Sequence, residues 1–451
     1  MLQKFQQHIN TDFSFLKNKK LLIAISGGVD SVVLAHLLSQ LKFDISLAHC
    51  NFNLRGDESI ADEQFVVELG NQLNILTCTT SFNTEKTATE NKQSTQVAAR
   101  NLRYTWFDEL RLKYDFDYIL TAHHADDNLE TFLINFTRGS GLDGLTGIPT
   151  TNGYAVRPLL VFSRDEIIQF ATENSVNWRE DQSNASTKYL RNKIRHQILP
   201  ILKEINPSML NSFQKTIHHL QESQEIIKDR VEDISRNSVE KLDAFQLNSI
   251  PDLILKINVL QLKKLSNPKA YLYQLLKDYH FTEWEDVTHL LEAQSGKQVF
   301  SKTHRLLKDR GFLLLSKIHS NVSSSAIETF FIKENTSKIT KPLHLEFKSV
   351  TEISNKNTQI IYLDKEQLLF PLILRKWQKG DFFHPMGMQG KKKLSKFFKD
   401  EKYSLLEKES TWILCSEKEI IWIVGKKQSR YFLPTPKTKN LLKISQVLSP
   451  L

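Results

Sequence analysis

Apolar and polar positions along the first third of the chain predict strands and helices in alternation. Four apolar runs have the length and composition of buried strands: LLIAIS (21–26), DISLAHC (44–50), NILTCTTSF (74–82) and FDYILTAH (116–123). Segments such as VVLAHLLSQL (32–41) lie between them and carry apolar residues at helical spacing. This order predicts a parallel, Rossmann-like sheet with helices on both faces.

The pattern changes beyond Pro149. RPLLVFSRDEIIQFATENS (157–175) reads as a strand and a helix that begins after Ser163, with Glu166 placed for a capping box. YLRNKIRHQILPILKEI (189–205) is a basic amphipathic helix. We therefore expect four segments: a catalytic domain over 1–205, a mostly helical middle domain over 206–320, a linker with short strands over 321–370, and a small basic α+β domain over 371–451.

The first predicted strand runs into the sequence SGGVDS. Its glycines, hydroxyls and amides suit a phosphate, which needs dense hydrogen-bond donation and close backbone approach. An ordinary tight turn is the alternative. The carboxylate of Asp30 suits Mg²⁺ rather than a phosphate oxygen, because like charges repel. The predicted ATP-binding residues are Ser26, Gly27, Gly28, Val29, Asp30 and Ser31.

A second polar segment, TAHHADDNLE (121–130), begins where another predicted strand ends, so it should lie at the same edge of the sheet. Asp127 and Glu130 are three residues apart and share one face of a helix. Two carboxylates there suit a cationic amine or a second metal. The alternative, that acids favour a helix N-terminus, explains Glu130 poorly. Arg103 and Arg195 are basic candidates for the same edge.

Charge is concentrated at the end of the chain. The formal net charge is +9, but residues 371–451 hold 17 Lys and Arg against 7 Asp and Glu. Aromatic residues are interleaved with these charges, which favours a folded RNA-contacting module over a solubilising tail. The predicted tRNA-binding residues are Lys391, Lys392, Lys393 and Lys396.

Composition excludes several classes of protein. No run of 18 apolar residues is present, and the first twenty residues lack the apolar core of a signal peptide. The three cysteines form no CxxC pair. We therefore expect a cytoplasmic protein with no membrane contact.

The loop SGGVDS resembles that of the N-type ATP pyrophosphatases, the PP-loop superfamily. A longer series of motifs resembles the tRNA(Ile)-lysidine synthetase family over about residues 20–200 and 371–435. It comprises HCNFNLRGDES, AARNLRY, TAHHADDNLETFLINFTRGSGLDGLTGI, RPLL, WREDQSN, YLRNKIRH and RKWQKGDFFHPMGMQGKKKLSKFFKDEK. One departure is visible, because Phe52-Asn53 stands where the family pattern has His-Gly.

The resemblance implies a reaction. With ATP and Mg²⁺, such enzymes adenylate the C2 oxygen of the wobble cytidine (position 34) in an isoleucine tRNA with a CAU anticodon. Free L-lysine then displaces AMP and leaves lysidine, which changes codon reading from AUG to AUA. On this basis Asp30, Asp127, Arg103 and Arg195 are the expected catalytic residues. Asp30 is the metal ligand, and Asp127 and Glu130 bind lysine.

Two alternatives remain open from the sequence alone. Another PP-loop tRNA-modifying enzyme is one, although thiolases need a persulfide-carrying cysteine and related amidotransferases often carry a cysteine where Leu2 stands. A non-catalytic tRNA-binding protein is the other, but such a protein has no use for Asp30 or for the Asp127/Glu130 pair. A homodimer is left open.

Overall fold

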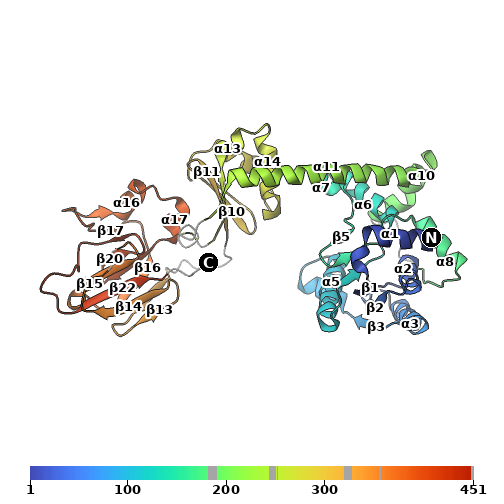
Figure 1. Ribbon diagram of the computed structural model, residues 1–451, viewed down its shortest axis with the longest axis horizontal. Coiled ribbons are helices and arrows are strands. Elements are labelled where there is room, and N and C mark those ends of the chain that lie inside the picture. Colours follow the sequence, from blue (N-terminus) through green and yellow to red (C-terminus); the bar gives the residue numbers. More distant parts are fainter. Residues whose placement is uncertain (181–189, 243–249, 251, 319–327, 355–356, 448–451) are drawn as a thin grey trace. The chain divides into compact units, whose positions relative to one another are not determined.

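The computed structural model describes residues 1–180, 190–242, 250, 252–318, 328–354 and 357–447. The chain divides into two compact units, Met1–Ile227 and Lys228–Leu451 (Figure 1). Within the described ranges, no helix has the length and apolar character needed to cross a bilayer.

The first unit is built on a six-stranded sheet in the order β3-β2-β1-β4-β6-β5. All neighbours are parallel except the β5–β6 pair. Ile23 of β1 lies opposite both Leu47 and Leu120. The predicted parallel sheet is confirmed. Its strands are β1 (Lys20–Ala24), β2 (Asp44–Asn51), β3 (Thr77–Ser81), β4 (Tyr118–Leu120), β5 (Thr151–Asn152) and β6 (Ala155–Val156).

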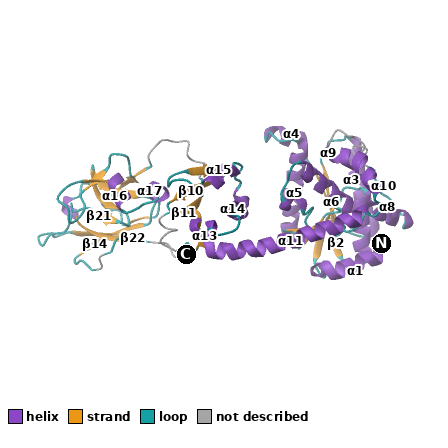
Figure 2. Cartoon of the chain, turned by 90° about the horizontal axis from the view of Figure 1, so that it is seen from above, coloured by secondary structure: helices purple, strands orange, loops and turns teal. Residues whose placement is uncertain are grey.

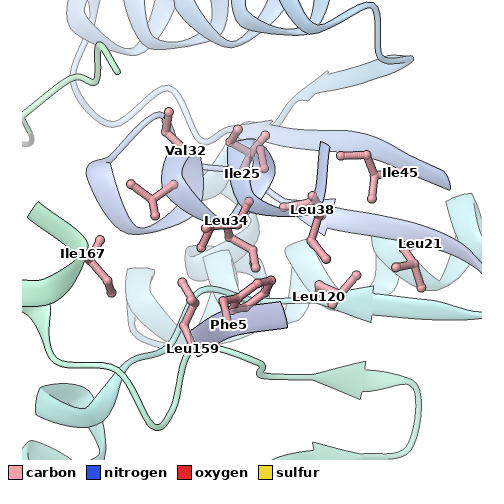
Figure 3. Close-up of a cluster of buried hydrophobic side chains, with 14 of the residues drawn as sticks. Phe5, Leu21, Ile25, Val32, Leu34, Leu38, Ile45, Leu120, Leu159 and Ile167 are labelled. Carbon is pink, nitrogen blue, oxygen red and sulfur yellow. The ribbon is translucent and has the colours of Figure 1, made fainter. Parts of the chain in front are cut away.

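Both faces of this sheet are buried, as its near-continuous apolar strands require. Leu21 and Ile23 pack on one face in a core with Phe5, Leu34 and Ile167 (Figure 3), whereas Leu22 faces the opposite way toward Phe107 and Ile119. The helices of the unit are α1 (Leu2–Asp12), α2 (Val29–Gln40), α3 (Asp57–Leu73), α4 (Thr84–Glu90), α5 (Thr95–Tyr114), α6 (Ala125–Thr137), α7 (Leu142–Leu145), α8 (Arg164–Glu173), α9 (Leu190–Lys193), a π-helical turn η3 (Ile194–Ile198) and α10 (Leu199–Ile205). Helix α11 (Met209–Ser238) begins in this unit and ends in the second.

The second unit begins with a five-stranded antiparallel sheet in the order β7-β8-β11-β10-β9. The expected helices of the middle region are present, but this sheet accompanies them and was not predicted. The elements are β7 (Val239–Glu240), β8 (Leu253–Asn258), α13 (Val259–Lys263), α14 (Pro268–Leu276), α15 (Trp284–His289), β9 (Gln298–Phe300), β10 (His304–Asp309) and β11 (Phe312–Lys317).

The remaining elements form two larger antiparallel sheets, ordered β12-β16-β19-β20-β21 and β13-β14-β22-β15, and the two-stranded β17–β18 pair. Figure 2 labels β21 of the first sheet and β14 and β22 of the second. Strands before residue 371 pair with strands after it, so the expected boundary at 371 falls inside both larger sheets. The elements are β12 (Thr329–Ile332), β13 (Lys338–Ile339), β14 (Leu345–Val350), β15 (Ile360–Asp364), β16 (Leu372–Lys376), β17 (Phe382–Phe383), β18 (Lys392–Lys393), α16 (Leu394–Asp400), α17 (Leu405–Ser410), β19 (Trp412–Ser416), β20 (Glu419–Ile423), β21 (Lys427–Gln428) and β22 (Leu441–Gln446).

Candidate active site

The loop between β1 and α2 is held in shape by its own serines. The Ser26 amide donates to Ser31 Oγ at 3.2 Å, and Ser31 Oγ donates to the Gly28 carbonyl at 3.0 Å. Gly27 has φ +90°, a conformation that residues with a Cβ rarely adopt. Helix α2 starts at Val29, so the loop presents amides at the N-terminus of a long helix, where an anion is stabilised.

Asp30 lies in the first turn of α2 and carries an unusual oxygen. Its Oδ1 is buried and has no hydrogen-bond partner. Burial raises the pKa of Asp30 above its usual range; His124 opposes the shift, and Asp127 adds to it. Among the described residues no cluster of three or more His, Cys, Asp or Glu side chains could hold a metal. A lone unpartnered carboxylate oxygen beside a phosphate loop is nevertheless what Mg²⁺ uses when phosphates and water supply its other ligands.

His124 joins the loop to helix α6. It caps that helix, where Nδ1 accepts from the Asp127 amide at 3.4 Å and the backbone N–H of His124 donates to Asp127 Oδ2 at 3.2 Å. His124 Nε2 lies 3.8 Å from Asp30 Oδ1 and 3.4 Å from Asp127 Oδ2. The ring therefore stands between the two acids.

Two arginines cover the acids of α6. Glu130 is fully buried and accepts from Arg191 Nε at 2.7 Å and from Arg195 Nε at 2.6 Å. Asp127 Oδ1 accepts from Arg195 Nη2 at 2.9 Å and lies 3.3 Å from Arg191 Nη2. Burial alone would raise the pKa of Asp127, but His124 and the arginines hold it below its usual range. Asp127 is thus kept ionised, and both carboxylates are paired with arginines.

The segment that carries these arginines is locally unwound and anchored. Arg195 lies in the π-helical turn η3, a distortion that is frequent at functional sites. Further along, Lys203 of α10 pairs with the buried Asp126 at 2.8 Å, and Asp126 also accepts from the Arg164 amide at 2.9 Å. Helix α6 therefore fixes the arginine segment through two neighbouring acids, Asp126 and Asp127.

Three family models match the chain: a PP-loop domain over residues 1–202, a TilS substrate binding domain over 252–318 and a TilS substrate C-terminal domain over 372–444. The tRNA(Ile)-lysidine synthase of Parabacteroides distasonis is 38% identical over 432 residues, 94% of this chain and 95% of that protein. That of Bacteroides thetaiotaomicron is 36% identical and covers 98% of both chains. The chain belongs to the tRNA(Ile)-lysidine synthase family. It is accordingly an ATP-dependent ligase with a PP-loop nucleotide site.

The structure brings together most of the site residues that were predicted in the first unit. Asp30 and Asp127 approach His124, and Arg195 connects Asp127 with Glu130. Among the described residues, no ion pair or hydrogen bond joins Arg103 to this cluster. The Arg103 guanidinium lies 5.1 Å from the ring centroid of Phe52, one of the two residues that depart from the family pattern. The roles given to all of these side chains stay predictions.

The predicted tRNA-binding lysines lie on and beside β18 in the second unit. Lys391, Lys393 and Lys396 are exposed, whereas Lys392 pairs with Asp400 at 2.8 Å. Lys391 Nζ also stands 4.5 Å from the ring centroid of Phe382. Their contact with tRNA stays a prediction. Of the motif WREDQSN, residues 181–184 lie outside the described residues.

The sequence reading missed His124 as the link between the acids and assigned no role to Arg191. The signal for Arg191 was present, because Arg191 and Arg195 are four residues apart and share a helical face. Pairing with Asp127 and Glu130, more than sixty residues away, had no local signature.

Proposed function

We propose that this chain ligates the ε-amine of free L-lysine to C2 of the wobble cytidine in isoleucine tRNA with a CAU anticodon. One observation carries the proposal: in a chain of this family, His124 links Asp30 of the phosphate loop to Asp127, which the arginines of the following segment bind. One side of the site suits a triphosphate, and the other suits a charged amine and a polyanion.

In the first step, the cytidine O2 bonds to the α-phosphorus of ATP, and the bond from that phosphorus to the β-bridging oxygen breaks. The electron pair leaves with pyrophosphate. The loop amides and the hydroxyls of Ser26 and Ser31 bind phosphate oxygens. Asp30 Oδ1 would hold Mg²⁺, which when bound offsets the charge of the phosphates. Arg103 and Arg195 orient the anionic tRNA backbone around the extruded base.

In the second step, the lysine amine bonds to C2, the C2–O bond breaks, and AMP departs with that oxygen. The amine must first lose a proton to water, and Asp127, kept ionised, binds the ammonium form of lysine before that loss. Lysine has to share Asp127 with an arginine. Arg191, with 42% of its side chain exposed, can move away, whereas Arg195 is 19% exposed and holds Glu130 through two nitrogens. Glu130 then serves to keep Arg195 in place while the ammonium binds.

Other PP-loop chemistries fit less well. Thiolation needs a reactive thiolate, but burial raises the pKa of Cys50 to about 12 and that of Cys415 to about 11, and it also raises the pKa of Cys78. A tRNA-binding protein without catalysis would not keep a buried, unpartnered carboxylate oxygen in its phosphate loop.

The direct test is exchange of labelled pyrophosphate into ATP. We expect exchange with the CAU-anticodon isoleucine tRNA in the absence of lysine, because adenylation comes first and is reversible. Added lysine should drain the adenylate and suppress the exchange. Exchange that needs no tRNA, or none under any condition, would contradict the proposal.

A further inference from the structure

A recess of about 230 Å³ opens where β2 ends. Its walls come from the two residues that follow β2 and from the start of α4: Phe52, Asn53, Asn83, Thr84 and Glu85. Strands β2 and β4 flank β1 on opposite sides, so the recess and the acids of α6, which follows β4, lie on opposite sides of the phosphate loop. No residue of the recess has a role in the steps derived above.

Hydrogen bonds hold the walls of the recess in place. Thr84 Oγ1 donates to the Phe52 carbonyl at 2.9 Å, and Asn53 Nδ2 donates to the Phe82 carbonyl at 3.2 Å. Asn53 has φ +52°, a left-handed conformation that asparagine adopts more readily than most residues. Asparagine can therefore stand where the family pattern has glycine, and its amide also ties the two walls together.

The recess offers an aromatic ring beside a cation. The rings of Phe52 and Phe82 are stacked, with centroids 5.9 Å apart and an interplanar angle of 24°. The Arg103 guanidinium lies 5.1 Å from the Phe52 centroid. Unstacked bases of single-stranded RNA bind to aromatic side chains and to arginine guanidiniums, and a cation also attracts the phosphates that flank such a base. The recess therefore suits a nucleobase of an RNA.

The phosphate loop lies close to the recess along β2. The Ile25 amide donates to the Ala48 carbonyl at 3.0 Å, and His49 Nδ1 lies 3.0 Å from the Ile25 carbonyl. Ile25 directly precedes the loop residue Ser26. Phe52 is three residues beyond His49, a span of at most about 10 Å in an extended strand. The recess and the phosphate loop thus belong to the same edge of the sheet.

A carboxylate on the wall can distinguish one base from another. Glu85 is exposed in the first turn of α4, and among the described residues no ion pair or hydrogen bond engages its carboxylate. A carboxylate accepts from the N4 amine of cytosine, whereas uracil has an acceptor oxygen in that place. The amine is bonded to C4 and the reactive oxygen to C2, so a cytosine held by its amine keeps O2 free.

We infer that this recess binds the extruded wobble cytosine of the tRNA, with Phe52 stacking on the base and Glu85 accepting from its N4 amine. The inference rests on the proposed function, in which O2 of that base has to reach the α-phosphate of ATP. Phe52 binds the base whatever its identity, and Glu85 selects cytosine over uracil.

Competition binding with the full chain tests both roles. The probes are two forms of the CAU-anticodon isoleucine tRNA, with cytidine or uridine at position 34, in Mg²⁺ buffer with a non-hydrolysable ATP analogue. We expect the wild type to prefer cytidine by about tenfold, the lower end for a charge-assisted contact because Glu85 is exposed. E85Q should reduce this preference to less than about twofold, because an amide can accept from an amine or donate to an oxygen.

The stacking role has its own variants. F52L keeps an apolar side chain without a ring, so it should weaken both tRNAs by about fivefold or more and leave the preference for cytidine unchanged. F52H supplies the planar ring of the family pattern and should bind both tRNAs within about twofold of the wild type. The matched control is E90Q, at the other end of α4 and outside the recess, which should change neither affinity nor preference.

Two results would overturn the inference. An unchanged preference in E85Q, together with normal affinity in F52L, would leave the recess as packing between β2 and α4. Weaker binding of ATP without tRNA in E85Q, at an unchanged preference, would place the adenine of ATP there instead. Because Glu85 is exposed, E85Q should fold, so the preference is measurable even if F52L does not fold.

These measurements involve neither lysine nor turnover, so they can fail while lysidine formation stands. Conversely, a wild-type chain that preferred cytidine through Glu85 but made no lysidine would defeat the proposed function alone.

Discussion

Asp30→Asn should make the folded protein more stable near neutral pH and almost inactive. Burial raises the pKa of Asp30 in the folded state above its value in the unfolded chain. An acid with a raised folded pKa contributes fully to stability below the unfolded pKa, and that contribution is lost as the pH rises through the folded pKa. At pH 7 the ionised carboxylate therefore costs stability, and asparagine removes the charge at nearly the same volume.

The size of the effect follows from the unpartnered oxygen. A buried polar atom without a hydrogen bond costs about 1–3 kcal/mol, and we take the lower end, ~1 kcal/mol, because the asparagine oxygen inherits part of the penalty. The Asp30 side chain is 30% exposed, which also favours the lower end. For a domain of this size, ~1 kcal/mol in the free energy of unfolding corresponds to about 2–4 °C in Tm. Loss of the proposed metal ligand should remove several kcal/mol of charge stabilisation and lower turnover by about a thousandfold or more.

The assay combines thermal melts without Mg²⁺, over a series of pH values, with turnover in saturating Mg²⁺ and ATP. The stability advantage of the variant should shrink as the pH falls through the raised pKa of Asp30. Asp117→Asn is the matched control and should lower the Tm at pH 7. Lys19 and the Lys20 amide hold the pKa of Asp117 below its usual range, so its ionised carboxylate stabilises the folded state. A D30N protein that melts lower than wild type at pH 7, or that keeps near-normal turnover, would refute the reasoning.

Three further predictions concern other parts of the chain. Glu130→Gln removes the carboxylate that Arg191 and Arg195 share and should lower the free energy of unfolding by about 3–5 kcal/mol in denaturant titrations. The same change at the exposed Glu173 should cost almost nothing, and equal effects would contradict the ion-pair account. Cys50→Ala should keep lysidine formation, and iodoacetamide at pH 8 should not inactivate the wild type, because burial raises the pKa of Cys50 to about 12. Three exposed lysines lie outside the Lys392–Asp400 pair: Lys391, Lys393 and Lys396. Replacing all three by alanine should lower tRNA affinity with little change in Tm, and the slope of log affinity against log salt should become shallower by roughly 0.7–0.9 per lost phosphate contact. An unchanged slope would show that these lysines form only a solvated surface.

Much of the first unit could be predicted because its signals are local. Continuous apolar runs flanked by helical periodicity predicted β1 to β4 and the helices between them, and Ser163 with Glu166 forms the predicted capping box. Helix α4 was not predicted, because it forms in a polar stretch, where Asn83 is its N-cap. The sheet β7-β8-β11-β10-β9 was missed for a different reason. Short apolar runs such as LILKIN fit a helix or a strand, and only the pairing of β8 with the distant β11 decides between them.

The candidate site was predicted in its residue types and not in its connections. The loop residues and Asp30 lie together because they are contiguous in the sequence. Asp127 and Glu130 lie together because they are three residues apart on α6. The partners of those acids come from a segment more than sixty residues later, and Arg179 reaches Asp62 across 117 positions. Such pairs depend on the tertiary fold, so the spacing of polar and apolar residues along the sequence does not predict them.

Mass spectrometry of the CAU-anticodon isoleucine tRNA, after incubation with the protein, ATP, Mg²⁺ and lysine, tests the central claim most directly. The account predicts that the wobble cytidine gains the mass of lysine less one water, that the gain requires ATP, and that D30N protein does not produce it. An unmodified cytidine with active, folded wild-type protein, or the same gain on a tRNA with another anticodon, would contradict it.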